Sequence, residues 1–240
     1  MERAYPFLTA QWRNLVMFNY EVNPALLIDR VPSGTTLDFF QGKTYVSLVG
    51  FQFLESRILG APIPFHRDFE EINLRFYVRC ASGAELRTGV VFICEVVPRA
   101  FVGGMARLLY REPYTIAPIR SEVRALGGAP PAVTYEWEAR GRWNRLSADA
   151  MGPGAPPAAG SLDEFLTVRH RGYNGQPRSD TLEYRVEHPP WTLWRASRSS
   201  VEAELESLCG AELGRELTRP ACVILAEGSP VTIYWRTRLS

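Results

Sequence analysis

The sequence predicts one mainly β domain of the α+β class over residues 1–240, built on a strongly curved antiparallel sheet or barrel with a few short peripheral helices. Segments rich in β-branched and aromatic residues recur along the chain, and turns containing Gly, Pro or Ser separate them. The 240-residue length suits a single sandwich or barrel. A composition of 46% hydrophobic and 12% aromatic residues supplies the core that such a domain needs.

The first half of the chain alternates short helices with pairs of strands. Asn23 and Pro24 suit an N-cap and a first helical position, so a short helix is expected there. The strands that follow are predicted at 35–40, 43–53, 69–80 and 86–97. Turns at 41–42 and 81–84 join them into two hairpins, of which the second is expected to be central. A further short helix is predicted for 98–112.

The second half continues the antiparallel pattern. Its predicted strands are 114–126, 132–146 with a turn at Gly141, 182–186, 191–197, 221–226 and 231–238. Ser161 and Glu164 have the spacing of a capping box and predict a short helix, and 201–209 predicts another. The Gly-, Pro- and Ala-rich residues 151–160 are expected to form a long surface loop.

Charge and motif patterns exclude several classes of function. The net charge is +1 with acids and bases interleaved, so neither nucleic acid nor a membrane surface is an expected partner. Neither a signal peptide nor an apolar run of about 18 residues is found, which predicts a cytoplasmic protein. The four cysteines are scattered and are expected to be reduced, and the three histidines lack the spacing of a metal site. No nucleotide or other cofactor motif occurs.

Three segments together carry a resemblance to a known family. They are Asn-Pro-Ala-Leu-Leu at 23–27 running to Leu-Asp-Phe-Phe-Gln-Gly at 37–42, Phe-Glu-Glu-Ile-Asn-Leu-Arg-Phe-Tyr-Val at 69–78, and Phe-Leu-Thr at 165–167 with His-Pro-Pro-Trp at 188–191. In this order and spacing they resemble the YqjF-like family, which is similar in fold to acetoacetate decarboxylase. The resemblance implies a conical antiparallel β-barrel with a ligand cavity inside it, and a homo-oligomer.

The chain lacks the lysine on which acetoacetate decarboxylase chemistry depends. That family uses a lysine with a lowered pKa as a Schiff-base nucleophile. The comparable stretch here, 109–115, contains Arg111 but no lysine, and a guanidinium stays protonated and is not nucleophilic. Of the 27 basic residues 26 are arginine, and the one lysine, Lys43, lies beside a predicted turn, where it is expected to be solvated. The sequence therefore argues against Schiff-base decarboxylation.

One strand carries the best candidate site. Period-two alternation in 69–80 places Glu71, Asn73, Arg75 and Tyr77 on one face and the apolar residues Ile72, Leu74, Phe76 and Val78 on the other. Either the polar face points to solvent, or it lines the barrel cavity and binds an oxygen-rich ligand. In a cavity, Arg75 would anchor a carboxylate and Glu71 would act as a general acid or base. A purely structural ion pair between these two residues is the alternative.

A second group of candidates surrounds the position that corresponds to the lysine of acetoacetate decarboxylase. Tyr110, Glu112 and Tyr114 flank it and are expected to contribute to the same site. Alternatively, a helix ends at Pro113 and Tyr114 packs into the core. His66 is a further candidate for the cavity mouth, or an exposed loop residue without a role.

Three hypotheses of function follow. In the first, the barrel binds a small carboxylate- or carbonyl-bearing molecule. In the second, it is an enzyme that performs acid–base chemistry on a keto or enol substrate with Glu71 and Tyr114. In the third, it is a protein-interaction scaffold, which a filled barrel without a cavity would favour.

Overall fold

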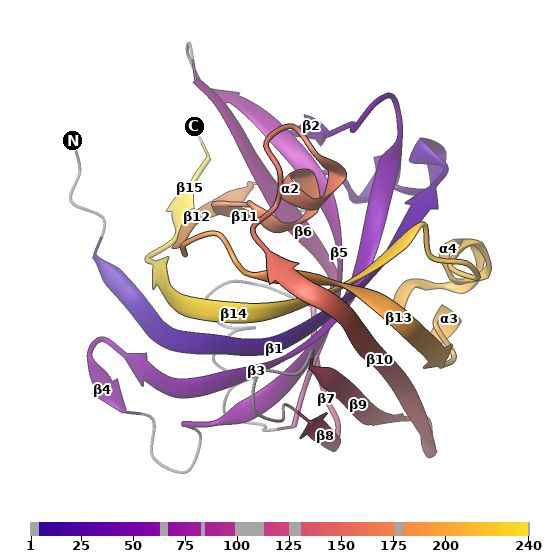
Figure 1. Cartoon of the computed structure of the whole chain (residues 1–240). Coiled ribbons are helices and arrows are strands. Elements are labelled where there is room, and N and C mark those ends of the chain that lie inside the picture. The colour runs from indigo at the N-terminus through magenta and orange to yellow at the C-terminus, as the bar shows by residue number, and fades with distance from the viewer. Residues whose placement is uncertain are drawn as a thin grey trace.

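A computed structural model describes residues 5–62, 67–82, 85–98, 113–124, 131–175 and 180–239 (Figure 1). Within them, fifteen strands form one continuous sheet. The strands are β1 (Pro6–Val22), β2 (Thr36–Leu37), β3 (Thr44–Ile58), β4 (Ala61–Pro62), β5 (Phe69–Ser82), β6 (Glu85–Val97), β7 (Tyr114–Ile116), β8 (Ile119–Arg124), β9 (Ala132–Ala139), β10 (Arg142–Ala155), β11 (Arg171–Asn174), β12 (Leu182–Glu187), β13 (Leu193–Glu202), β14 (Cys222–Tyr234) and β15 (Thr237–Arg238). The helical elements are η1 (Pro24–Leu26), η2 (Ile28–Arg30), α2 (Leu162–Thr167), α3 (Glu206–Cys209) and α4 (Ala211–Glu216).

Seven strands close into a ring. Their order is β12-β11-β6-β5-β3-β1-β14, and a short pairing of β12 with β14, which includes Val186 opposite Ile233, joins the two ends. The pairs within the ring are antiparallel apart from β6 with β11, which meet in parallel at Val90 and Gly172. The mainly β, barrel-like architecture predicted from the sequence is therefore confirmed.

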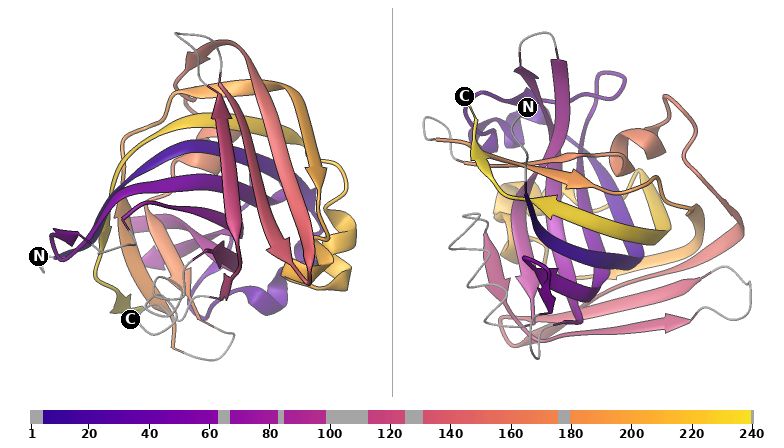
Figure 2. Two further views of the ribbon diagram at one scale, coloured as in Figure 1. Left: turned by 90° about the horizontal axis from the view of Figure 1, so that it is seen from below. Right: turned by 90° about the vertical axis from the view of Figure 1, so that its left-hand side faces the viewer.

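The remaining large strands form a second wall. The sheet continues from β14 through β13, β10 and β9 to β8, and these strands stand against one side of the ring (Figure 2). An outer core of apolar residues fills the space between wall and ring, and it includes Phe18, Leu74, Tyr135, Trp137 and Leu146. The strands of the ring that face this wall are consequently buried on both sides.

The interior of the ring holds a separate inner core. Residues of β1, β3 and β5 that alternate with those of the outer core point inward, among them Met17, Val49 and Phe51. This double burial explains the composition of β5, whose apolar face serves the outer core while its polar face lies inside the ring. The solvent-exposed alternative for that face is wrong.

Local capping and turn signals in the sequence are mostly confirmed. Asn23 caps η1 by accepting a 3.0 Å hydrogen bond from the Ala25 amide, and Ser161 caps α2 by accepting from the Glu164 amide at 3.1 Å. Gln41 and Gly42 adopt positive φ angles in the turn that pairs Phe40 with Lys43. However, β2 pairs with β5 and not with β3. Of the first predicted hairpin, only the turn at 41–42 is therefore present, and its two strands do not pair with each other.

Four expectations for the elements need correction. β1, the longest strand, was not predicted. Residues 151–155 belong to β10 and are not loop. Most of 201–209 is not helical, because β13 continues to Glu202 and α3 covers only four residues. The C-terminal strands do not form a hairpin; β14 passes through 228–229 without a break. The helix predicted for 98–112 lies almost wholly outside the described residues.

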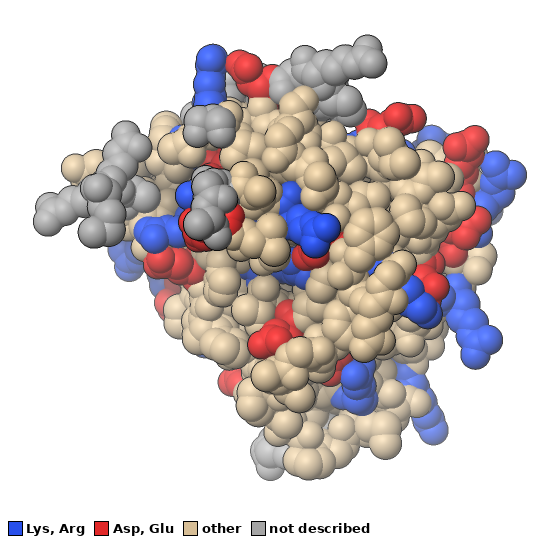
Figure 3. Space-filling view, turned by 90° about the horizontal axis from the view of Figure 1, so that it is seen from above, with Lys and Arg blue, Asp and Glu red and all other residues tan. Residues whose placement is uncertain are grey.

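The helices, the surface and the cysteines add three observations. No helix in the described part of the chain is both long and apolar enough to cross a membrane. On the face shown in Figure 3, basic and acidic side chains are interspersed among uncharged ones, without a large patch of one sign. The four cysteines are all free, and three are buried.

Candidate functional site

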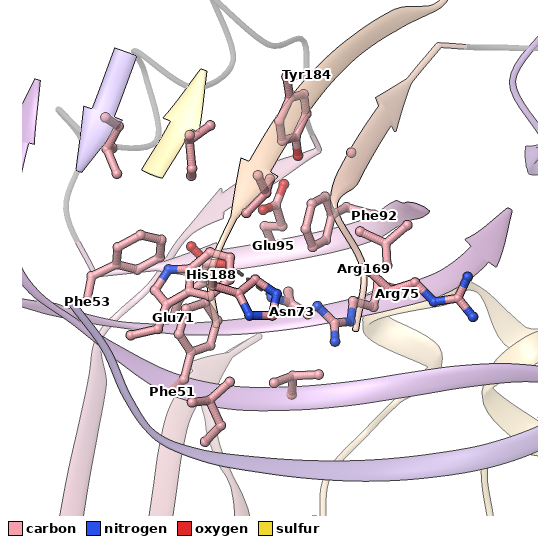
Figure 4. Close-up of a pocket in the computed structure, with 18 of the residues that line it drawn as sticks. Phe51, Phe53, Glu71, Asn73, Arg75, Phe92, Glu95, Arg169, Tyr184 and His188 are labelled. Carbon is pink, nitrogen blue, oxygen red and sulfur yellow. Dashed lines mark hydrogen bonds between the residues drawn. The ribbon is translucent and has the colours of Figure 1, made fainter. Parts of the chain in front are cut away.

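A cavity of about 130 Å³ lies inside the ring. Its wall is mostly apolar, but polar side chains from four parts of the chain converge on it (Figure 4). These are Glu71, Asn73 and Arg75 of β5, Glu95 of β6, Thr167, Arg169 and Arg171 around the end of α2 and the start of β11, and His188 after β12. A buried, mainly apolar hollow with a few convergent polar groups is the usual form of a small-molecule site.

The β5 residues enter the cavity because their neighbours are fixed in the outer core. Ile72, Leu74 and Phe76 are fully buried there, so alternation turns Glu71, Asn73 and Arg75 inward. These three side chains belong to residues that are only 3%, 2% and 8% exposed. The sequence prediction that this face lines a cavity therefore matches the geometry for these three residues.

Arg75 and Asn73 retain polar atoms without partners among the described residues. Arg75 Nη2 donates a long 3.4 Å hydrogen bond to the Leu166 carbonyl, whereas its Nε has no acceptor there. Asn73 Nδ2 donates to Glu71 Oε1 at 3.1 Å, and Asn73 Oδ1 has no donor. No ion pair joins Arg75 to Glu71 within the described chain, so the purely structural pairing considered from the sequence is not seen.

Arg169, in contrast, has a carboxylate partner. Its Nη1 lies 2.6 Å from Asp38 Oδ2, its Nε donates to the Phe165 carbonyl at 2.6 Å, and its guanidinium lies 4.1 Å from the centre of the Phe165 ring. Burial lowers the pKa of Arg169, and the Asp38 carboxylate opposes that shift. Arg171 likewise lies 3.3 Å from Glu183. Of the three cavity arginines, Arg75 is thus the one that lacks a carboxylate partner in the described structure.

Glu95 and Tyr114 complete the side of the cavity beyond Asn73. Glu95 pairs in register with Asn73 across β5 and β6, and with Tyr114 across β6 and β7. Both residues are buried, at 2% and 8% exposure, and both line the cavity. Tyr114 was a candidate from the sequence, but Glu95 was not. The sequence did contain a signal for Glu95, because it is the one charged residue in the apolar run 89–97.

His188 lies over the middle of the cavity and is half-buried. Its Nδ1 lies 3.0 Å from the Pro189 carbonyl, and its ring stacks on Trp191 at 4.7 Å. Since a carbonyl can only accept, Nδ1 carries the proton in this contact, and the backbone of Arg169 is a second hydrogen-bonding neighbour of the ring. Burial is the main cause that lowers the pKa of His188 below its usual value near 6.5, so the ring is neutral at pH 7.

The other candidates lie elsewhere or cannot be placed. Tyr77 points inward but lies beside the cavity, where its hydroxyl is bonded to Ser47 at 2.6 Å and to the Leu166 carbonyl at 3.3 Å. Lys43 is exposed and lies 2.7 Å from Glu21, whose hydrogen bond raises the lysine pKa. The cavity wall therefore contains no lysine. Tyr110, Glu112 and His66 lie outside the described residues.

The described part of the chain shows no group of three or more His, Cys, Asp or Glu side chains that could hold a metal ion. The acidic residues that line the cavity, Glu71 and Glu95, are accompanied by arginines and an amide. This set of side chains suits hydrogen bonding and acid–base chemistry.

Comparison with known sequences identifies relatives over most of the chain. The family DUF2071, described as "Uncharacterized conserved protein", matches residues 9–230. Uncharacterized protein YqjF of Bacillus subtilis is 27% identical over 189 residues, which are 77% of this chain and 74% of that protein.

Solved structures of similar fold cover nearly the whole chain at low identity. The enduracididine biosynthesis enzyme MppR complexed with pyruvate has a TM-score of 0.64 and 15% identity, covering 100% of this chain and 92% of that one. Acetoacetate decarboxylase from Legionella pneumophila has a TM-score of 0.66 and 13% identity, covering 99% and 88%. An acetoacetate decarboxylase-like enzyme from Sphingomonas wittichii has a TM-score of 0.63 and 16% identity, covering 98% and 94%. The fold is acetoacetate decarboxylase-like.

Proposed function

Since this chain belongs to the DUF2071 family and has the acetoacetate decarboxylase-like fold, we propose that its cavity binds a small carboxylate with an adjacent carbonyl group, such as a 2-oxo acid. The observation that carries the proposal is the Arg75 guanidinium, which is buried without a carboxylate partner in the described structure. An unpaired buried charge costs several kcal/mol. A ligand carboxylate supplies the missing counter-charge.

The atoms around Arg75 suit the two ends of such a ligand. The planar guanidinium can donate two parallel hydrogen bonds to a carboxylate, with Nε as one of the donors. Asn73 uses one amide N–H for Glu71 Oε1 and retains a second, which can donate to the ligand carbonyl. Glu71 then holds the Asn73 amide in the orientation that this contact needs.

The size of the cavity limits the ligand. An apolar protein cavity of about 150 Å³ holds one benzene molecule. The volume here, about 130 Å³, is slightly smaller. It therefore accommodates roughly six non-hydrogen atoms, which is the size of pyruvate.

The comparisons support this class of ligand but do not identify the ligand itself. One of the similar structures is a complex of MppR with pyruvate. The cavity of this chain offers no lysine for a covalent adduct, so we expect reversible binding and no product that borohydride reduction can trap.

Thermal unfolding of the wild type and of Arg75→Ala in the presence of pyruvate and 2-oxobutyrate tests the proposal. At about 100 times its dissociation constant, a ligand of the folded state stabilises it by roughly 2.7 kcal/mol. We expect this shift for the wild type and its loss in Arg75→Ala. Arg124→Ala, which removes an exposed arginine of β8, is the control and should keep the shift. Equal shifts in the wild type and Arg75→Ala would contradict the assignment of Arg75.

His188 favours a second candidate function, which is acid–base catalysis on the same ligand. A neutral imidazole in the wall of the same cavity as the buried carboxyl group of Glu71 can remove a proton from the carbon next to the ligand carbonyl and return it. We expect slow exchange of deuterium from D₂O into C3 of 2-oxobutyrate, followed by NMR. Because the base must be neutral, the rate should rise with pH through the lowered pKa of His188 and then stay level.

The matched variants are His188→Gln and His170→Gln. The first removes the base and should reduce exchange by about 100-fold or more. The second removes an exposed neighbouring ring and should leave the rate at the high-pH plateau unchanged. If wild-type protein binds the ligand but does not accelerate exchange, the chain is a binding protein and this second function fails.

A further inference from the structure

One end of the cavity is entirely apolar. On adjacent strands Leu8 of β1 lies opposite Ile58 of β3 and Ile233 of β14, and Ile233 in turn lies opposite Val186 of β12. All four line the cavity, so they form an unbroken aliphatic row across four neighbouring strands. None of them offers a hydrogen-bonding side chain to a ligand.

An aromatic cluster adjoins this row. Trp12 meets Phe51 and Phe53 edge-on at 5.7 and 5.9 Å, and Phe53 stacks on Phe69 at 4.8 Å. These four rings also line the cavity. Together the row and the rings make a mainly apolar surface that binds hydrocarbon well. Its one polar group is the indole N–H of Trp12, which is buried and has no acceptor among the described residues.

The apolar end and the arginine are separated along the ring. Phe69 and Arg75 belong to the same strand and are six residues apart, which corresponds to about 20 Å between their Cα atoms. Figure 4 shows Phe51 and Phe53 on one side of the cavity and Arg75 and Arg169 on the other. A ligand whose carboxylate is bound by Arg75 therefore directs its other end toward the rings.

The apolar surface continues outside the cavity. Leu8, Ile58 and Ile233 are half-buried, and beyond them Tyr5, Leu59 and Trp235 are 73%, 69% and 44% exposed. Hydrogen bonds from the Leu59 amide to the Phe7 carbonyl and from the Trp235 amide to the Tyr5 carbonyl hold these three residues at the same edge of the ring. Exposed apolar residues that adjoin a cavity are typical of a binding site.

We propose that the natural ligand is a carboxylate with an apolar tail, which lies against the aromatic cluster and leaves the cavity past the side chains of Leu8, Ile58 and Ile233. This inference rests on the proposed function for the carboxylate end of the ligand. It goes beyond it because it assigns the other end to hydrocarbon. It also reconciles a small cavity with a larger ligand, since the end of the tail lies outside the enclosed volume.

Calorimetric titration with a homologous series measures the tail directly. The ligands are pyruvate, 2-oxobutyrate, 2-oxohexanoate and 2-oxooctanoate, with 2-oxoadipate as the polar counterpart of 2-oxohexanoate. Each methylene that is buried should strengthen binding about fourfold. We expect 2-oxohexanoate to bind at least tenfold more tightly than pyruvate, and 2-oxooctanoate to bind no worse than 2-oxohexanoate. The second carboxylate of 2-oxoadipate has no cation at the apolar end and should weaken binding at least tenfold relative to 2-oxohexanoate.

Two substitutions on β3 separate the tail site from a general loss of stability. Ile58→Thr changes the cavity edge, and Leu54→Thr changes a half-buried residue of the same strand that does not line the cavity. Ile58→Thr should reduce the affinity for 2-oxooctanoate, the longest member of the series, several-fold and leave that for pyruvate unchanged, whereas Leu54→Thr should alter neither. If pyruvate binds through Arg75 but affinity is flat or falls along the series, the tail is refuted and the proposed function stands. If no member binds, both are refuted.

Discussion

At the scale of single residues, two of the three cavity arginines, Arg169 and Arg171, lie beside a carboxylate, and Arg75 does not within the described structure. Arg169 and Asp38 are 6% and 8% exposed, and they come from segments 131 residues apart. Their contact ties the end of α2 to the chain that precedes β3. It also holds Arg169 against the Phe165 ring, which leaves Arg75 as the cavity arginine available to the proposed ligand.

Removing Asp38 tests this arrangement. Asp38→Ala leaves the Arg169 guanidinium buried without its counter-ion, and we expect a loss of about 3–5 kcal/mol in the free energy of unfolding, measured in urea. Arg124→Ala at the exposed pair with Glu122 should change it by less than about 0.5 kcal/mol. A similar effect of the two substitutions would mean that solvent reaches Arg169 and that the pair is not structural.

Single residues also mark the limit of what the sequence could predict about the site. The alternation in β5 sufficed to identify Glu71, Asn73 and Arg75 as a group, because strand period is a local property. Arg169 and His188 reach the cavity from distant segments, and nothing in their neighbourhood predicts which partners they meet. His188 was considered only as a metal ligand, since a lone histidine shows neither its burial nor its neutral state.

At the scale of elements, local signals were reliable and long-range ones were not. The hairpin of β5 and β6 was predicted because both strands and their turn are adjacent in sequence. β1 was missed because its residues mix polar and apolar types, as expected of a strand whose two faces meet different surroundings. β14 was divided into two because Gly228 and Ser229 suggest a turn. Instead, Gly228 has a φ of +85° and its Cα lies so close to the Trp12 carbonyl that no side chain fits. The strand thus bends around β1 without ending.

At the scale of the whole molecule, the outer and inner cores share their walls. β1, β3 and β5 each contribute alternate residues to both cores, so neither core can lose these strands without exposing the other. The ring itself is closed by few hydrogen-bonded positions, namely the parallel contact of β6 with β11 and the short pairing of β12 with β14. We therefore expect the described structure to unfold as one unit. The packing of both cores compensates for the small number of backbone hydrogen bonds that close the ring.

Hydrogen exchange in a variant of the outer core tests this expectation. Leu74 is fully buried there, and Leu74→Ala should cost about 2–5 kcal/mol. β9 packs on the outer core, and β12 belongs to the ring. If the two cores unfold together and amides of both strands exchange by global unfolding, the free energy of exchange should fall by the same amount in β9 and in β12. Reduced protection in β9 with unchanged protection in β12 would show that the second wall opens alone. The ring and its cavity would then persist without the wall, and ligand binding should survive Leu74→Ala under conditions in which β9 is already exchanging.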